Sequence, residues 1–212
     1  MDKTRHLLII SVITLILIGI SYSIAVQQGF ANNSLTNAAF MELLPEECRV
    51  MSISEGVTAG VSFRRDKFGN ITDKTYVNLY TKNIYAGANA GFCITAQNIA
   101  DIPISVDEFM LHVDGNKSAI SELIYFSGSV KIYRNNGTYY DVLGTFRNIA
   151  LSELAGNLTS LTKYRKIDSG EKLVLELNQQ LDDGPVKLTG KAGLSYKLVP
   201  VFIQYFPRKD DI

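Results

Sequence analysis

The chain has 212 residues, of which 46% are hydrophobic and 20% charged, and its formal net charge is zero. This composition excludes a disordered or collagen-like protein, and a neutral chain offers no basic field for nucleic acid. The length suits one domain with its own core once an N-terminal targeting segment is removed.

Residues 1–25 have the pattern of a helical secretory signal peptide. Two basic residues within the first five positions precede the uncharged run 7–20, and the small residues Ser23 and Ala25 follow it. Signal peptidase is then a partner during export, and the cut falls after Ser23 or Ala25. The alternative is a permanent anchor, because the apolar stretch comes close to the roughly 20 residues that span a bilayer. Both readings place the rest of the chain outside the cell, with the membrane contacted only through the leader.

Five Asn-x-Ser/Thr sequons support that side assignment and predict a secreted glycoprotein. Turn residues are the alternative explanation for several of them. The candidate glycosylation sites are Asn32, Asn70, Asn116, Asn136 and Asn157.

The two cysteines, Cys48 and Cys93, are the next feature of the chain. Outside the cell such a pair more often forms a disulfide than a metal or redox site. The alternative is a pair of buried thiols that pack as small hydrophobic groups.

Beyond the leader, short runs of alternating or β-branched residues recur between turn residues. Strands are predicted at 76–81, 92–97, 104–109, 130–133, 139–143, 173–177 and 194–206.

Three local features refine this pattern. Asn136-Gly137 between two apolar runs is a hairpin signal. Pro200 indicates a bulge or an edge position in the last strand. Only residues 149–161 have helical spacing, which Gly156 interrupts.

Many short strands separated by turns indicate an all-β, jelly-roll-like sandwich preceded by the signal helix. The predicted organisation is a signal peptide at 1–25, an N-terminal extension at 26–44 and a sandwich domain at 45–212.

The residues give little support for a catalytic function. Outside the leader the chain keeps one histidine, His112, so a helical His-Glu-x-x-His zinc site is impossible. No Gly-x-Ser-x-Gly elbow nominates a nucleophile and no phosphate loop is present. The expectation is a protein that is not an enzyme, with no catalytic residues, no metal and no cofactor.

Three further segments follow one another along the chain. The leader is followed by a polar stretch and then by Leu35-Thr-Asn-Ala-Ala-Phe-Met-Glu-Leu43. The second segment is Ala86-Gly87…Asn98-Ile-Ala-Asp-Ile-Pro-Ile104, and the third is Asp168-Ser-Gly-Glu171, which precedes a strand near the end of the chain. In this order the segments resemble the TasA/camelysin family of biofilm-matrix fibre subunits, which includes archaeal bundling pilins. The second segment is similar to the family's Pro-Gly-Asp…Asn segment, with Ala86 in place of proline.

The resemblance implies a pilin-like subunit of an extracellular filament on the cell surface, contributing to biofilm matrix or to cell–cell bundling. Its partner is itself, in a head-to-tail homopolymer joined by donor-strand complementation. The donor is then the mature N-terminus, with an ordinary first strand of the same subunit as the alternative. The apolar candidates for insertion are Leu35, Phe40, Met41, Leu43 and Leu44.

Two other functions stay open at this stage. A membrane-anchored β-sandwich binding module requires an uncleaved leader. A secreted protease of the camelysin type requires a zinc-ligand set that this sequence does not offer.

Overall fold

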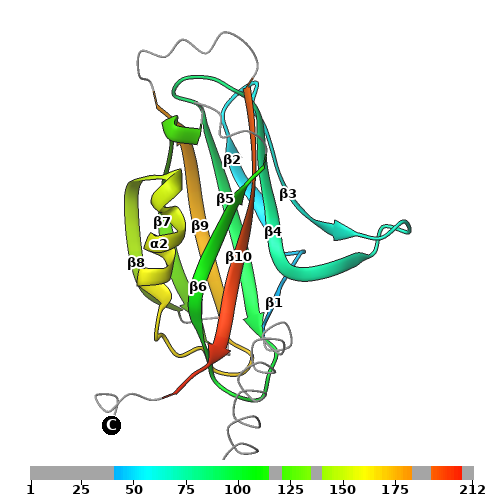
Figure 1. Ribbon diagram of the computed structural model, residues 1–212, viewed down its shortest axis with the longest axis vertical. Helices are drawn as coiled ribbons and strands as arrows, with labels where there is room; N and C mark the ends of the chain where they lie inside the picture. Colours follow the sequence, from blue (N-terminus) through cyan, green and yellow to red (C-terminus); the bar gives the residue numbers. More distant parts are fainter. Residues whose placement is uncertain (1–40, 115–120, 135–139, 183–191, 207–212) are drawn as a thin grey trace, which may run out of the picture. The chain divides into compact units, whose positions relative to one another are not determined.

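The computed structural model describes residues 41–114, 121–134, 140–182 and 192–206. In these ranges the chain forms two antiparallel β-sheets that face each other, with one α-helix along one side (Figure 1). The predicted all-β sandwich is confirmed, while the signal helix lies outside the described residues.

The larger sheet has the order β1-β5-β9-β7-β8, and β2 also pairs with β5. Its strands are β1 (Met41–Leu43), β2 (Arg49–Ile53), β5 (Asn89–Asn98), β7 (Ile124–Tyr133), β8 (Tyr140–Ala150) and β9 (Lys172–Leu181).

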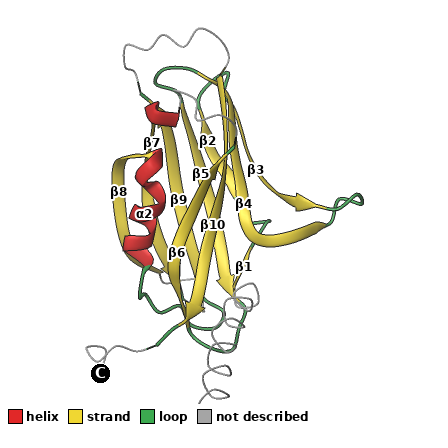
Figure 2. Cartoon of the chain, in the orientation of Figure 1, coloured by secondary structure: helices red, strands yellow, loops and turns green. Residues whose placement is uncertain are grey.

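The smaller sheet has the order β3-β4-β10-β6. Its strands are β3 (Thr58–Arg65), β4 (Ile71–Ile84), β6 (Ile104–Val113) and β10 (Ala192–Gln204). A short 3-10 helix, η2 (Ser121–Leu123), leads into β7. Figure 2 shows that strands make up almost all of the regular structure.

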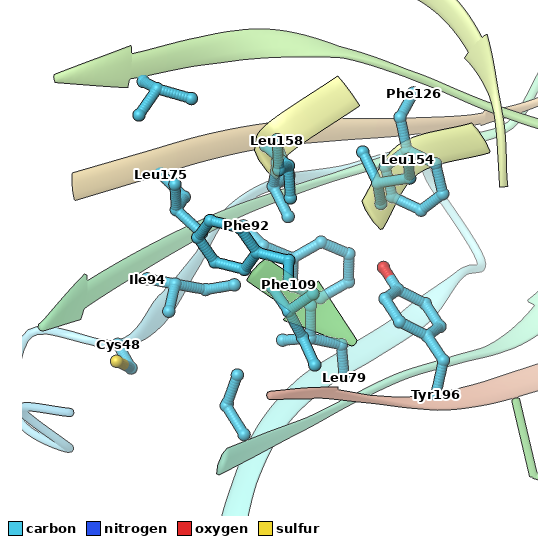
Figure 3. Packing of buried hydrophobic residues seen from close by; sticks show 14 of the residues in the cluster. Cys48, Leu79, Phe92, Ile94, Phe109, Phe126, Leu154, Leu158, Leu175 and Tyr196 are labelled. Carbon is cyan, nitrogen blue, oxygen red and sulfur yellow. The ribbon is translucent and has the colours of Figure 1, made fainter. Parts of the chain in front are cut away.

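The core lies between the sheets, because each inner strand turns alternate apolar side chains toward it. Phe126 of β7 meets Tyr196 of β10 edge to face, with ring centroids 5.7 Å apart. The buried Tyr196 hydroxyl lies 3.2 Å from Gln179 Oε1, and the Gln179 amide donates to Thr81 Oγ1 at 3.0 Å. This chain of hydrogen bonds satisfies polar groups in a region that Figure 3 shows filled with apolar side chains.

The one α-helix in the described part of the chain, α2 (Leu151–Thr162), begins directly after β8. Leu151, Leu154 and Leu158 recur at helical spacing and are all buried against the strands. Gly156 is tolerated because a Cβ at that position would meet nothing within 4 Å. The helix predicted at 149–161 is confirmed to within two residues at each end.

Pro200 lies in β10 where that strand has only one neighbour. The pairing of β10 with β4 ends at Leu198, whereas its pairing with β6 continues past Pro200 to Gln204. Proline has no N–H to donate, so a position with one paired side costs little. The register shifts between Val201 and Phe202, which confirms the bulge predicted here.

The β3–β4 hairpin extends beyond the rest of its sheet (Figure 1). Its turn is organised by Asp66, whose Oδ1 accepts the N–H groups of Phe68 at 2.8 Å and of Asn70 at 2.9 Å. The side-chain hydrogen bond from Asn70 is the largest cause that lowers the pKa of this carboxyl, and backbone hydrogen bonds from Phe68, Gly69 and Asn70 add to it. Phe68 stands 78% exposed in this turn.

Candidate subunit interface

The chain enters the sandwich through β1, a strand of three residues on the edge of β5. Met41 and Leu43 are each 2% exposed, and the Leu44 N–H donates to the Thr95 carbonyl at 2.8 Å. Glu42 on the opposite face pairs with Lys74 at 2.7 Å. In the single chain this stretch is therefore a first strand of its own subunit.

Some of the candidate donor residues belong to the chain's own sandwich and others lie before it. Met41 and Leu43 lie in the chain's own core, and Leu44 is half-buried just after β1. Leu35 and Phe40 lie outside the described residues. A donor role consequently has to fall on the chain before Met41.

Asn98 and the loop 168–171, which belong to two of the segments that carry the family resemblance, meet at the end of the sandwich where β1 enters. The Asn98 Nδ2 donates to the carbonyl oxygens of Ile102 at 2.9 Å and Ile167 at 3.0 Å. The Gly170 N–H donates to the Asn98 carbonyl at 2.8 Å, and the Asn98 N–H donates to the Glu171 carbonyl at 3.0 Å. Asn98 thus closes this end of the sandwich, which is a structural role.

Glu171 holds the neighbouring loop. Its side chain is 6% exposed, and its Oε2 accepts the Asp168 N–H at 2.9 Å and the Arg134 guanidinium at 2.6 Å. Arg134 also pairs with Asp141 of β8, so one cation joins β8 to this loop. A charge buried in this way is retained only because it is paired and hydrogen-bonded.

A groove of about 580 Å³ opens beside Arg134, between the first residues of β8 and the loop after α2. Ile132, which is 1% exposed, is one of the residues that line it. Tyr140, Tyr164 and Tyr205 line it together with basic side chains. Tyrosine combines an apolar ring with a polar tip, so this lining suits contact with another polypeptide.

A second hollow, of about 500 Å³, lies on the outer face of the larger sheet. Ion pairs cross it: Lys131 binds Glu176 at 2.7 Å, and Lys172 binds Glu47. The hydrogen bond from Lys131 is the main cause that lowers the pKa of Glu176. Both lysines of this face are thus paired within the chain, which is typical of a solvated sheet surface.

The edges of the two sheets differ in how they are covered. The backbone of β6 exchanges hydrogen bonds with the Ile167 backbone at Ile104, and its Phe109 N–H donates to Thr159 Oγ1 at 2.8 Å. In the larger sheet, β8 is the last strand, and within the described ranges β7 is its sole strand partner. The outer edge of β8 is therefore not paired with another strand of the described residues.

Cys48 and Cys93 are both buried and are not bonded to each other. The Thr95 N–H donates to Cys48 Sγ at 3.4 Å, and the thiol contacts the Thr95 carbonyl at 3.6 Å. Burial raises the pKa of the Cys48 thiol to about 11 and also raises the pKa of Cys93. The structure thus has the alternative form, two buried thiols, and a disulfide between them stays a prediction.

Iodoacetamide at pH 8 is expected to leave both thiols of the folded protein unmodified over an hour. A pKa of about 11 leaves only about one Cys48 in a thousand as the reactive thiolate, and burial excludes the reagent. Intact-mass spectrometry before and after unfolding in guanidinium measures the labelling. A Ser62→Cys variant, exposed on β3, is the control that reacts at once. Failure to label after unfolding without reductant, with a mass lower by two hydrogens, would show the disulfide instead.

Two sequons lie in the described residues. Asn70 is exposed in the β3–β4 turn, where its Nδ2 donates to Asp66 Oδ2 at 3.1 Å. Asn157 lies in α2, its Oδ1 is buried without a partner, and the Thr159 hydroxyl of the same sequon donates to Ala155 O. Asn70 is the more accessible acceptor of the two. The sequons Asn32, Asn116 and Asn136 lie outside the described residues.

His112 is exposed on β6 and faces Lys197 of β10 in the sheet register. Within residues 41–114, 121–134, 140–182 and 192–206, no group of three or more His, Cys, Asp or Glu side chains is placed to hold a metal ion. The same part of the chain contains no helix that is long and apolar enough to cross a membrane.

Family models and curated proteins give no match to this chain. The resemblance to the TasA/camelysin family therefore rests on the three segments alone.

Proposed function

We propose that the protein is a pilin-like structural subunit of an extracellular filament that grows head-to-tail by donor-strand complementation. The exported chain carries the leader pattern at 1–25 and an antiparallel sandwich that begins at Met41. Between them lies a stretch, 26–40, without a charged residue or a proline. Such a stretch is able to pair as a β-strand with an exposed sheet edge.

The observation that carries the proposal is the position of β1. The chain reaches the sandwich at the margin of a sheet through only three paired residues, Met41–Leu43. The proposed donor is the stretch before Met41, which continues into β1 at this sheet margin. A contact of this kind joins different surfaces on the two subunits, so it does not close and propagates as a filament.

Leader cleavage would control when assembly begins. A cut after Ser23 or Ala25 creates the free end that the neighbouring copy receives, so polymerisation waits for export. Uncleaved chains would stay attached to the membrane as the alternative, an anchored binding module. The mass of the N-terminal peptide of the native protein distinguishes these two forms.

Deletion of residues 24–33 from the mature protein is expected to abolish filaments while leaving a folded monomer. The sandwich keeps all of its own strands in this variant, because β1 begins at Met41. Negative-stain electron microscopy and size-exclusion chromatography measure assembly, and thermal unfolding measures the fold.

Two comparisons sharpen this test. Replacing 24–33 by a Gly-Ser linker of equal length is expected to fail in the same way, because the linker lacks the apolar side chains that bind. A truncation of 207–212 is expected to polymerise like the parent chain. Filaments formed by the 24–33 deletion would exclude the N-terminal stretch as donor.

A further inference from the structure

We infer that Asn70 in the β3–β4 turn carries an N-linked glycan, and that the exposed ring of Phe68 packs against its first sugar. The turn lies where this hairpin extends beyond the rest of its sheet (Figure 1), so a bulky group attached there has room around it. The inference rests on the proposed function only for export of the chain, because secreted proteins receive such sugars whether or not they polymerise.

Both side chains of this sequon are presented to solvent. Asn70 directly precedes β4, Thr72 is the second residue of that strand, and both are exposed. Side chains two positions apart on an extended chain lie on the same side, so a transferase is able to read the amide and the hydroxyl together. In the helical sequon of α2, residues two apart do not face each other. There the Asn157 Oδ1 is buried, and the Thr159 hydroxyl accepts the Phe109 N–H of β6.

The hydrogen bonds that the Asn70 sequon already makes are compatible with a sugar. The Asn70 amide has two N–H groups, and one of them donates to Asp66 Oδ2 at 3.1 Å. Transfer forms a bond between Asn70 Nδ2 and C1 of a sugar linked to a lipid phosphate. The bond from C1 to the phosphate oxygen breaks, and the lipid phosphate leaves with its electron pair. One amide proton passes to a base and the other stays on Nδ2, so the contact with Asp66 survives the modification.

The Asp66 carboxylate also holds Phe68 beside the acceptor. Its Oδ1 accepts the backbone N–H groups of Phe68 at 2.8 Å and of Asn70 at 2.9 Å, so the two nitrogens are no further apart than the sum of these lengths. Gly69 lies between the two residues with a left-handed backbone, φ 87°. A Cβ added to this glycine would meet nothing within 4 Å. The turn is therefore open between the ring and the acceptor.

The Phe68 ring offers the apolar surface on which a sugar packs. Among the large hydrophobic side chains of the described residues it is the most exposed, at 78%. Lys67 Nζ lies over the ring, 5.0 Å from its centroid, and so occupies one face only. The faces of an aromatic ring are electron-rich, and the C–H groups on the apolar side of a pyranose carry partial positive charge. A sugar attached at Asn70 is thus able to cover the second face of the ring.

The surroundings of the ring favour a sugar over a protein partner. Residues 64–67 are all charged, and Gly69 and Asn70 follow the ring, so charged or polar positions flank Phe68 along the turn. A protein interface needs an apolar core that many residues supply. One pyranose is about the size of one phenyl ring, so a single aromatic side chain suffices for it.

The deciding measurement is the mass of one tryptic peptide from the native protein. Trypsin cuts after Lys67 and Lys74 and releases residues 68–74, in which Asn70 is the only asparagine. We expect this peptide to carry sugar on Asn70, and the peptide of a Thr72→Ala chain, which lacks the sequon, to carry none. The control Thr72→Ser keeps the sequon and is expected to stay modified. A native peptide found only in its unmodified form would overturn the inference.

Thermal unfolding tests the contact between the ring and the sugar. The four chains are the parent and Thr72→Ala, each with and without Phe68→Ala, purified from the same secreting cells. The glycosylated parent is expected to melt about 2–4 °C above its Thr72→Ala form, since a ring contact of ordinary strength has an effect of that size in a chain of this length. In the pair with Phe68→Ala the difference is expected to fall below about 1 °C. Equal differences in the two pairs would exclude a contact between Phe68 and the glycan.

This inference and the proposed function fail separately. Filaments built from chains with an unmodified Asn70 would overturn the inference and leave the proposed function intact. A glycosylated chain that forms no filaments would overturn the proposed function and keep the glycan at Asn70. A chain found only inside the cell would overturn both, because each of them needs export.

Discussion

Replacing Gly128 by alanine is expected to lower the free energy of unfolding by about 3 kcal/mol. Gly128 lies in β7 between β8 and β9, where an added Cβ would stand 1.9 Å from the Glu176 carbonyl oxygen and 3.1 Å from the Phe146 ring. The carbonyl belongs to the backbone of a central strand. This carbonyl cannot move without breaking the backbone hydrogen bonds that join β7 to β9, so a small shift cannot relieve the clash.

Gly156→Ala in α2 is the matched control and should change stability in the opposite direction. Its added Cβ meets nothing within 4 Å, and alanine is favoured over glycine inside a helix by about 1 kcal/mol. Urea unfolding of the two variants, followed by circular dichroism, measures both free energies. A Gly128→Ala protein as stable as the parent chain would mean that β7 and β9 are not paired at this register.

Replacing Phe92 by alanine is expected to cost about 3–5 kcal/mol. Phe92 is fully buried in β5, opposite Leu177 of β9, and lies among the apolar side chains between the sheets (Figure 3). Removing the ring loses its transfer free energy and leaves a cavity. The cavity cannot collapse easily, because β5 is hydrogen-bonded to β2 on one side and to β9 on the other.

Phe68→Ala is the same substitution in the exposed β3–β4 turn. Phe68 is 78% exposed, so the expected change in unfolding free energy is within about 0.5 kcal/mol. The same urea titration serves for both variants. Equal effects at the two positions would contradict the placement of Phe92 between the sheets.

Local patterns in the sequence predicted the elements that local physics determines. Leucines at helical spacing predicted α2, because one apolar stripe suffices to place a helix on a sheet. Asn136-Gly137 between apolar runs predicted the pairing of β7 with β8, which the register confirms. The turn itself lies outside the described residues.

The strands β2 and β3 were not predicted, because neither alternates cleanly. β2 is almost wholly exposed and β3 has one buried residue, Phe63. Margin strands need only one apolar face, and often less, so their period-2 signal is weak.

The roles of Asn98 and Glu171 could not be read from the sequence. The Asn98 amide binds a carbonyl 69 positions away, and Glu171 binds an arginine 37 positions away. The place of β8 at the margin of the larger sheet is equally non-local, since it depends on the sheet order β9-β7-β8 rather than on β8 itself. Two of the residues predicted for the donor, Met41 and Leu43, are buried in the core of their own chain.

The cover over β6 has a consequence for the form of the assembly. The segment that runs from Thr159 to Ile167 occupies the β6 margin with hydrogen bonds from its own chain. In the proposed filament each subunit gives one donor segment and receives one, a valence of two. Units of that valence produce unbranched chains whose two ends differ. One end of each fibre then keeps an empty acceptor surface, and the other end keeps an unused donor segment. A soluble peptide with the sequence of residues 24–40 would therefore stop growth only at the end with the empty acceptor surface.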